Sequence, residues 1–136
     1  MTQISIKHQE IKQVIEFLNE IELKPKQSRK RSIFIKHLAE RLELISEWEM
    51  EIVKRHAVLG EDGKPKEVEE GSFELLDGHI DSFKKDHIEL MEETFNYAII
   101  GEIHSTIKQV LDEYDQPLKG VEANVYSLLC DMFGVE

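Results

Sequence analysis

The sequence predicts a mainly α-helical fold, with an α+β fold as the alternative. Four to five helices are expected around one long helix, together with one or two short strands. Two observations support this prediction. Apolar residues recur at helical spacing over most of the chain, and strand-like stretches are confined to residues 2–7 and 94–100.

The long helix is predicted to run from Ser28 to about Leu59. Ser28 is expected to be its N-cap, because Pro25 disfavours a helical conformation at Lys24 and a serine oxygen can accept a first-turn N–H. The apolar residues of this stretch repeat at intervals of three, four and seven, which places them on one helix face. They are Ile35, Leu38, Leu42, Ile45 and Ile52, with Phe34 and Trp48 beside them.

Two elements are predicted before the long helix. Residues Thr2–Lys7 alternate polar and apolar side chains, which is typical of a short, half-buried strand. Residues 8–21 have apolar side chains at helical spacing and predict an amphipathic helix. Residues 22–27 then form a basic connector to the long helix.

The region after the long helix is expected to begin with a loop over residues 60–77 that contains an extended piece or a hairpin. Its glycines, among them the Asp62-Gly63 pair, interrupt regular structure. A helix follows from about His79 to Glu93. Residues 94–100 are aromatic and β-branched, so they predict a strand that pairs with residues 2–7. A continued helix is the alternative for this stretch.

Two further helices are predicted at the end of the sequence. The first runs from Gly101 to about Tyr114, and the second from Val121 to Phe133, with Val121 on its buried face. Cys130 lies in an apolar context, so we expect it to pack as a small buried hydrophobe. As the only cysteine, it excludes a disulfide within the chain.

The size and composition predict a single domain over residues 1–136, with residues 60–77 as an insertion. The content of 40% apolar and 33% charged residues is typical of a soluble globular protein. No apolar run reaches the roughly 20 residues that a membrane span needs. The first residues lack a signal-peptide core, so the expected location is the cytoplasm.

Charge is unevenly distributed along the sequence. Residues 1–39 contain eight Lys/Arg and four Glu, a net charge of +4, whereas residues 40–136 carry −15, which gives −11 for the whole chain. This acidity disfavours direct DNA binding, because such binding requires neutralisation of phosphates. It leaves open a local basic contact, and also an acidic surface that imitates a polyanion.

A basic cluster at the start of the long helix is the candidate binding site. Helix N-termini favour carboxylates, so several cations there oppose the helix dipole and mark a candidate seat for an anionic partner. The predicted binding residues are Lys24, Lys26, Ser28, Arg29, Lys30, Arg31 and Lys36. The alternative is that these cations are solvated or paired with the protein's own glutamates.

No catalytic residue, metal ligand or cofactor is predicted, and the protein is expected not to be an enzyme. The sequence contains no zinc, phosphate-loop or nucleophile motif. His79 and His87 are eight residues apart, about 12 Å along one helix, which is too far to share an ion. His56 and His104 are expected to be isolated surface or boundary residues.

Both ends of the sequence resemble a family of uncharacterised small proteins encoded by phages and prophages of Gram-positive bacteria. The first shared pattern is LK-x-x-x-SR-x-R, and the second is L-x-G-x-x-A-x-x-Y-x-x-L. They correspond here to Leu23, Lys24, Ser28, Arg29 and Arg31, and to Leu118, Gly120, Ala123, Tyr126 and Leu129. The Asp62-Gly63 turn is similar too, whereas the middle matches only in length and acidity. The resemblance implies a phage origin and an accessory role.

The primary hypothesis is therefore a non-enzymatic, phage-encoded accessory protein that binds a protein or an anionic small ligand through the basic helix start. One alternative is a virion or assembly component that oligomerises through the long helix. Another is an anti-defence protein that acts as a polyanion mimic or a nucleotide sponge. The expected location is the cytoplasm of the bacterial host, with the virion as the alternative.

Overall fold

The structure, a computed structural model, describes residues 2–136 and confirms the mainly helical fold class. Over these residues it contains five helices, one of them long, and four short strands that pair into two small antiparallel sheets. In chain order they are β1 (Thr2–Lys7), α1 (His8–Glu20), α2 (Pro25–His56), β2 (Glu67–Glu69), β3 (Ser72–Phe73), α3 (Ile80–Glu92), β4 (Thr94–Ile99), α4 (Gly101–Glu113) and α5 (Gly120–Phe133).

The chain divides into two compact units. Unit 1 comprises the residues up to Leu42 and those from Thr94 to Glu136, and unit 2 comprises Glu43–Glu93. The long helix α2 belongs to both units, because the division falls between Leu42 and Glu43. The single domain over residues 1–136 stays a prediction.

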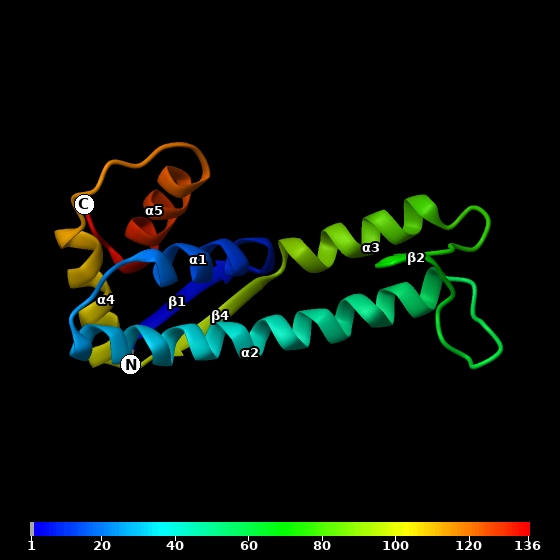
Figure 1. The fold of residues 1–136 in the computed structure, drawn as a ribbon, viewed down its shortest axis with the longest axis horizontal. Helices are drawn as coiled ribbons and strands as arrows, with labels where there is room; N and C mark the ends of the chain where they lie inside the picture. The colour runs from blue at the N-terminus through cyan, green and yellow to red at the C-terminus, as the bar shows by residue number, and fades with distance from the viewer. Residues whose placement is uncertain (1) are drawn as a thin grey trace. The chain divides into compact units, whose positions relative to one another are not determined.

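The sheet of unit 1 joins the two predicted terminal strands. β1 and β4 pair antiparallel, with Ile4 opposite Tyr97 and Ile6 opposite Phe95 (Figure 1). Ile4 and Ile6 are both buried, as the alternating pattern predicted. The predicted pairing of residues 94–100 with the first strand is confirmed, and the alternative of a continued helix is wrong.

The core of unit 1 lies between this sheet and the helices. Phe34 on α2 meets Phe133 on α5 edge-to-face, with ring centroids 5.7 Å apart. Leu38, Ile107 and Leu129 are completely or almost completely buried. Such side chains each contribute about 1.5–3 kcal/mol through removal of apolar surface from water.

The boundaries of the long helix differ from the prediction by three residues at each end. α2 begins at Pro25, not at Ser28, and the backbone N–H of Ser28 already donates to the Lys24 carbonyl at 2.9 Å. Proline suits the first helical position, because the N–H that it lacks would have had no partner there. α2 ends at His56, because Ala57 bridges to Leu75 in an extended conformation.

The buried face of α2 is also rotated relative to the prediction. Phe34, predicted to flank the apolar face, is fully buried, whereas Ile35 is only half-buried. Leu38, Ile45 and Ile52 are buried as predicted, while Leu42 is half-buried. The buried line therefore follows intervals of four and seven from Phe34.

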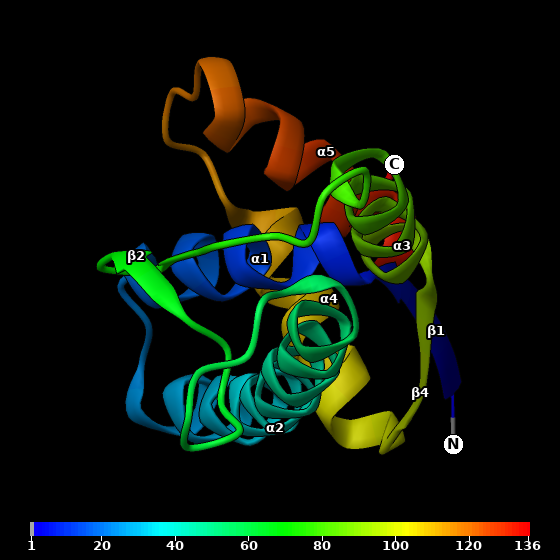
Figure 2. The same cartoon turned by 90° about the vertical axis from the view of Figure 1, so that its right-hand side faces the viewer.

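Unit 2 contains the predicted hairpin. β2 and β3 pair antiparallel within residues 60–77, which Figure 2 shows in green, and the turn at Asp62-Gly63 uses a positive φ of 76° at Gly63. The backbone N–H of Val58 donates to the Glu74 carbonyl, and that of Leu76 donates to the His56 carbonyl. These bonds tie the strands to the chain that follows α2.

Two expectations for the last helix are wrong. Val121 is 61% exposed although it was predicted to lie on the buried face, and Cys130 is half-buried instead of buried. Val125 and Leu129 are buried, so the helix itself is correctly oriented. Val121 lies in the first turn of α5, one turn before the buried Val125.

Candidate functional site

The basic cluster begins in an unusual local context. Lys24 precedes Pro25, and its backbone N–H donates to the Gln27 side-chain oxygen at 3.4 Å. Lys24 therefore precedes the first helical residue, and Gln27, three residues later, accepts the backbone N–H of Lys24 as a capping-box glutamine does. Ser28 instead lies inside the helix, where its oxygen accepts from Arg31 Nη2 at 3.5 Å.

Arg31 is used inside the protein. Its Nη1 donates to the carbonyl of Leu18 at 2.7 Å and also to the carbonyl of Ile21. These carbonyls lie in the last turn of α1 and just after it, where a cation is favoured by the helix dipole. Arg31 therefore caps α1. Its role as a ligand-binding residue stays a prediction.

Lys30 also has an internal partner. Its Nζ lies 3.0 Å from Oε1 of Glu102 in the first turn of α4, and the two side chains are 30% and 73% exposed. An ion pair as exposed as this contributes at most about 1 kcal/mol. Lys30 therefore pairs with one of the protein's own glutamates, which was the alternative expectation for the basic cluster.

The remaining cations form what we call the outer basic face: Lys24, Lys26, Arg29 and Lys36, with Ile33 among them. All four cations are exposed, and within residues 2–136 none has a side-chain ion pair. From Lys26 the intervals are three, seven and ten residues, which place Arg29, Ile33 and Lys36 on one helix face. Ile33 is 40% exposed.

The opposite face of α2 is held in place by packing. Phe34 and Leu38 are fully buried, and Nδ1 of His37 forms a hydrogen bond with the hydroxyl of Tyr97 on β4. Burial, together with the nearby Glu40 carboxylate, raises the pKa of Tyr97. These contacts fix the rotation of α2 and so keep Arg29 and Lys36 directed to solvent.

Unit 2 contains a histidine cluster that the sequence did not reveal. His56, expected to be an isolated surface or boundary residue, is only 6% exposed. Its Nε2 lies 2.6 Å from Asp86 Oδ2, and its Nδ1 lies 3.1 Å from Nδ1 of His79. Arg55 Nη1 also contacts Asp86 at 3.3 Å. The hydrogen bond from His56 holds the pKa of Asp86 below its usual value, against a smaller opposing effect of burial.

This cluster joins α2 to α3 within unit 2. Both ring nitrogens of His56 are engaged, so neither is available to take a proton from a substrate. Within residues 2–136, no three His, Cys, Asp or Glu side chains are grouped so that they could hold a metal ion. No local sequence signal could reveal the cluster, because His56 and Asp86 are separated by the whole hairpin.

Comparisons with protein-family models, with curated proteins and with solved structures find no match to this chain. Over residues 2–136, none of the helices combines the length and the apolar character that crossing a bilayer requires.

Proposed function

We propose that this is a non-enzymatic, phage-encoded accessory protein that docks an acidic protein surface on the outer basic face of α2. The phage origin is supported by the resemblance of both chain ends described above. The docking role is supported by one observation: the cations near the α2 start divide into an inner pair with structural partners and four outer cations without ion pairs.

The outer set is notable because carboxylates are abundant in this protein. The chain contains 28 Asp and Glu against 17 Lys and Arg. Arg29 and Lys36 are nevertheless exposed beside the exposed apolar side chain of Ile33, and neither has an ion pair within residues 2–136. Cations around a central apolar residue complement an acidic surface that has an apolar contact at its centre.

A protein surface fits this face better than a small anion does. Lys26 and Lys36 are ten residues apart, about 15 Å along the helix, so one small anion cannot contact both. A helix face is convex and cannot enclose a ligand, whereas small-molecule sites are concave. The net charge of −11 disfavours a nucleic acid as the partner.

The test uses the double variant Arg29→Glu/Lys36→Glu and the control Lys12→Glu/Lys108→Glu. Both variants change the net charge equally, and all four positions are exposed in unit 1. Partners captured from infected-cell lysate are identified by mass spectrometry and then measured with purified components. We expect at least about fourfold weaker binding for the outer-face variant, because two attractive contacts, each worth about 0.2–1 kcal/mol, become repulsive by a similar amount.

The thermal unfolding midpoint should stay close to the wild-type value in the outer-face variant, because both substituted side chains are exposed and have no ion pair within the described residues. Equal capture by the wild type and the outer-face variant would contradict the proposal. A stabilising thermal shift with cyclic nucleotides or polyphosphate, lost in the same variant, would replace the protein partner with a nucleotide ligand.

A further inference from the structure

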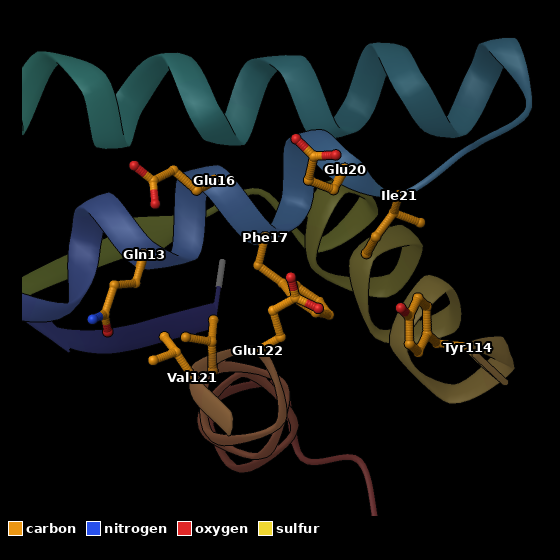
Figure 3. A pocket seen from close by; sticks show the side chains of 9 residues that line it. Gln13, Glu16, Phe17, Glu20, Ile21, Tyr114, Val121 and Glu122 are labelled. Carbon is orange, nitrogen blue, oxygen red and sulfur yellow. The ribbon is translucent and has the colours of Figure 1, made fainter. Parts of the chain in front are cut away.

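A groove in unit 1 lies between α1, α5 and the end of α4, and has a volume of about 590 Å³. Figure 3 shows Phe17 of α1, Tyr114 at the end of α4 and Glu122 of α5 gathered around this space. The groove is lined by none of the cations of the outer basic face. It is therefore a separate surface with different chemistry.

The floor of the groove is aromatic and firmly packed. The ring centroids of Phe17 and Tyr114 are 5.7 Å apart, and both rings contact Tyr126, at 6.1 and 5.4 Å respectively. The Tyr126 hydroxyl donates to the Leu111 carbonyl at 2.7 Å. Because aromatic rings held this way lose little freedom on binding, they are suited to anchor an apolar side chain of a partner.

The rim of the groove is acidic. A second hollow of about 550 Å³ shares Glu20, Ile21 and Tyr114 with the groove and continues it towards the start of α2. Neither hollow has a lysine or arginine in its lining. The carboxylates that line the two hollows are Glu16, Glu20, Glu22, Glu113, Asp115 and Glu122.

The protein does not neutralise these carboxylates itself. No ion pair within residues 2–136 involves any of the six. Glu113 and Asp115 accept hydrogen bonds only from the neutral amides of Gln109 and Gln116, both at 3.1 Å. Their summed field therefore extends into the groove and attracts cations.

One wall of the groove is an uncovered apolar residue. Val121 lines the groove and is 61% exposed, although its position in the helical pattern predicted burial. Glu122 follows it in the sequence, so the start of α5 places one apolar side chain next to one carboxylate. The groove thus presents apolar contacts flanked by carboxylates.

We infer that this groove binds a basic amphipathic segment of another protein. An apolar side chain of the segment packs on Phe17, Tyr114 and Val121, and flanking lysines or arginines contact the rim carboxylates. The alkyl stems of these cations cover apolar surface while their charged ends reach the carboxylates, and one cation can also lie over the Tyr114 ring. This inference goes beyond the proposed function, because it assigns a second surface of opposite charge.

The test uses a fluorescent 14-residue helical peptide with leucines on one face and lysines and arginines beside them. The variant Glu20→Gln/Glu122→Gln should weaken binding at least fivefold. The control Glu40→Gln/Asp131→Asn removes the same charge at exposed positions outside both hollows and should bind like the wild type. Val121→Asn should weaken binding about threefold or more without any change of charge.

A scrambled peptide of equal composition separates a built site from general attraction to an acidic protein. It should bind at least tenfold more weakly than the amphipathic peptide. Equal binding of both peptides, or equal loss in the control variant, would overturn the inference. So would spermine that displaces the peptide completely while Val121→Asn has no effect, because the groove would then be a polyamine site.

The position of the bound peptide gives an independent measurement. A photoreactive group at the central leucine should cross-link to residues 13–23 or 113–125, identified by mass spectrometry after digestion. Cross-links confined to residues 43–93 would overturn the inference. The variant Arg29→Glu/Lys36→Glu should keep peptide binding, so this test can fail or succeed independently of the proposed function.

Discussion

Two arginines that are two residues apart in the sequence have different roles. Arg31 donates to the carbonyls that end α1, whereas the exposed Arg29 has no ion pair within the described residues. The difference follows from helix rotation, because a step of two residues turns the side chain by about 200°. The sequence predicted both as binding residues, since it does not show that the end of α1 packs beside Arg31 in the folded chain.

Substitution of Arg31 by alanine should lower the free energy of unfolding by about 1.5–3 kcal/mol, because hydrogen bonds to a charged group are lost at the end of α1. Arg29→Ala serves as the control and should change it by less than about 0.5 kcal/mol. Urea unfolding followed by circular dichroism measures both values. Equal stability of the two variants would show that Arg31 does not cap α1.

Acid should weaken the contact between Asp86 and His56. The pKa of Asp86 is lowered in the folded protein, mainly by the His56 hydrogen bond. The unfolded chain therefore takes up this proton first as the pH falls. The stability contributed by Asp86 is present above its unfolded pKa of 3.8 and is lost as the pH falls through the folded value.

The variant Asp86→Asn should remove this part of the pH dependence. Urea unfolding between pH 6 and pH 3 should show a shallower decline for Asp86→Asn than for the wild type. The control Asp131→Asn replaces an exposed carboxylate in the other unit and should leave the wild-type slope unchanged. A wild-type slope in Asp86→Asn would mean that the His56 contact contributes nothing to folding.

At the scale of elements, periodicity predicted the order and type of the helices and of β1, whereas the hairpin of β2 and β3 was one of two alternatives for a loop marked only by its glycines and its proline. Residues that repeat at two or 3.6 positions share a face wherever they lie, so β1, α1, α3 and α4 were located to within one or two residues. The errors lie at the ends and in the rotation of α2. Its start depends on the Gln27 cap, and its end depends on the pairing of Ala57 with Leu75.

The rotation of α2 can be measured by two neighbouring substitutions. Phe34→Ala should lower the free energy of unfolding by about 3–5 kcal/mol, because it empties a fully buried site against Phe133. Ile35→Ala should cost less than half as much, since Ile35 is only half-buried. If Ile35→Ala lowered the free energy of unfolding more than Phe34→Ala does, the buried face of α2 would instead be the one that the sequence predicted.

At the scale of the whole molecule, most of the net negative charge lies in unit 2. Unit 2 contains 16 Asp and Glu and six Lys and Arg, a net charge of −10. Unit 1 contains 12 Asp and Glu and 11 Lys and Arg, a net charge of −1. Unit 1 nevertheless contains both an outer basic face and an acidic groove. Together the two proposals describe an adaptor that contacts two partners of opposite charge.

The two surfaces differed in how far the sequence could predict them. The outer basic face comes from one contiguous stretch, so its composition alone marked residues 24–36 as a candidate site. The groove draws on α1, the end of α4 and the start of α5, which are far apart in the sequence. Because the chain contains many carboxylates, nothing in the sequence singled out Glu16 and Glu122, which line the same groove only in the folded protein.

The pairing of β1 with β4 also has a consequence for synthesis on the ribosome. Lys7 pairs with Thr94, which is synthesised 87 residues later, and at about 5–20 residues per second this delay is about 4–17 s. Unit 2 is one continuous segment, so all its residues are available before β4 emerges. During this interval the apolar side of β1, including Ile4 and Ile6, has no partner strand and is exposed to chaperones and to other nascent chains.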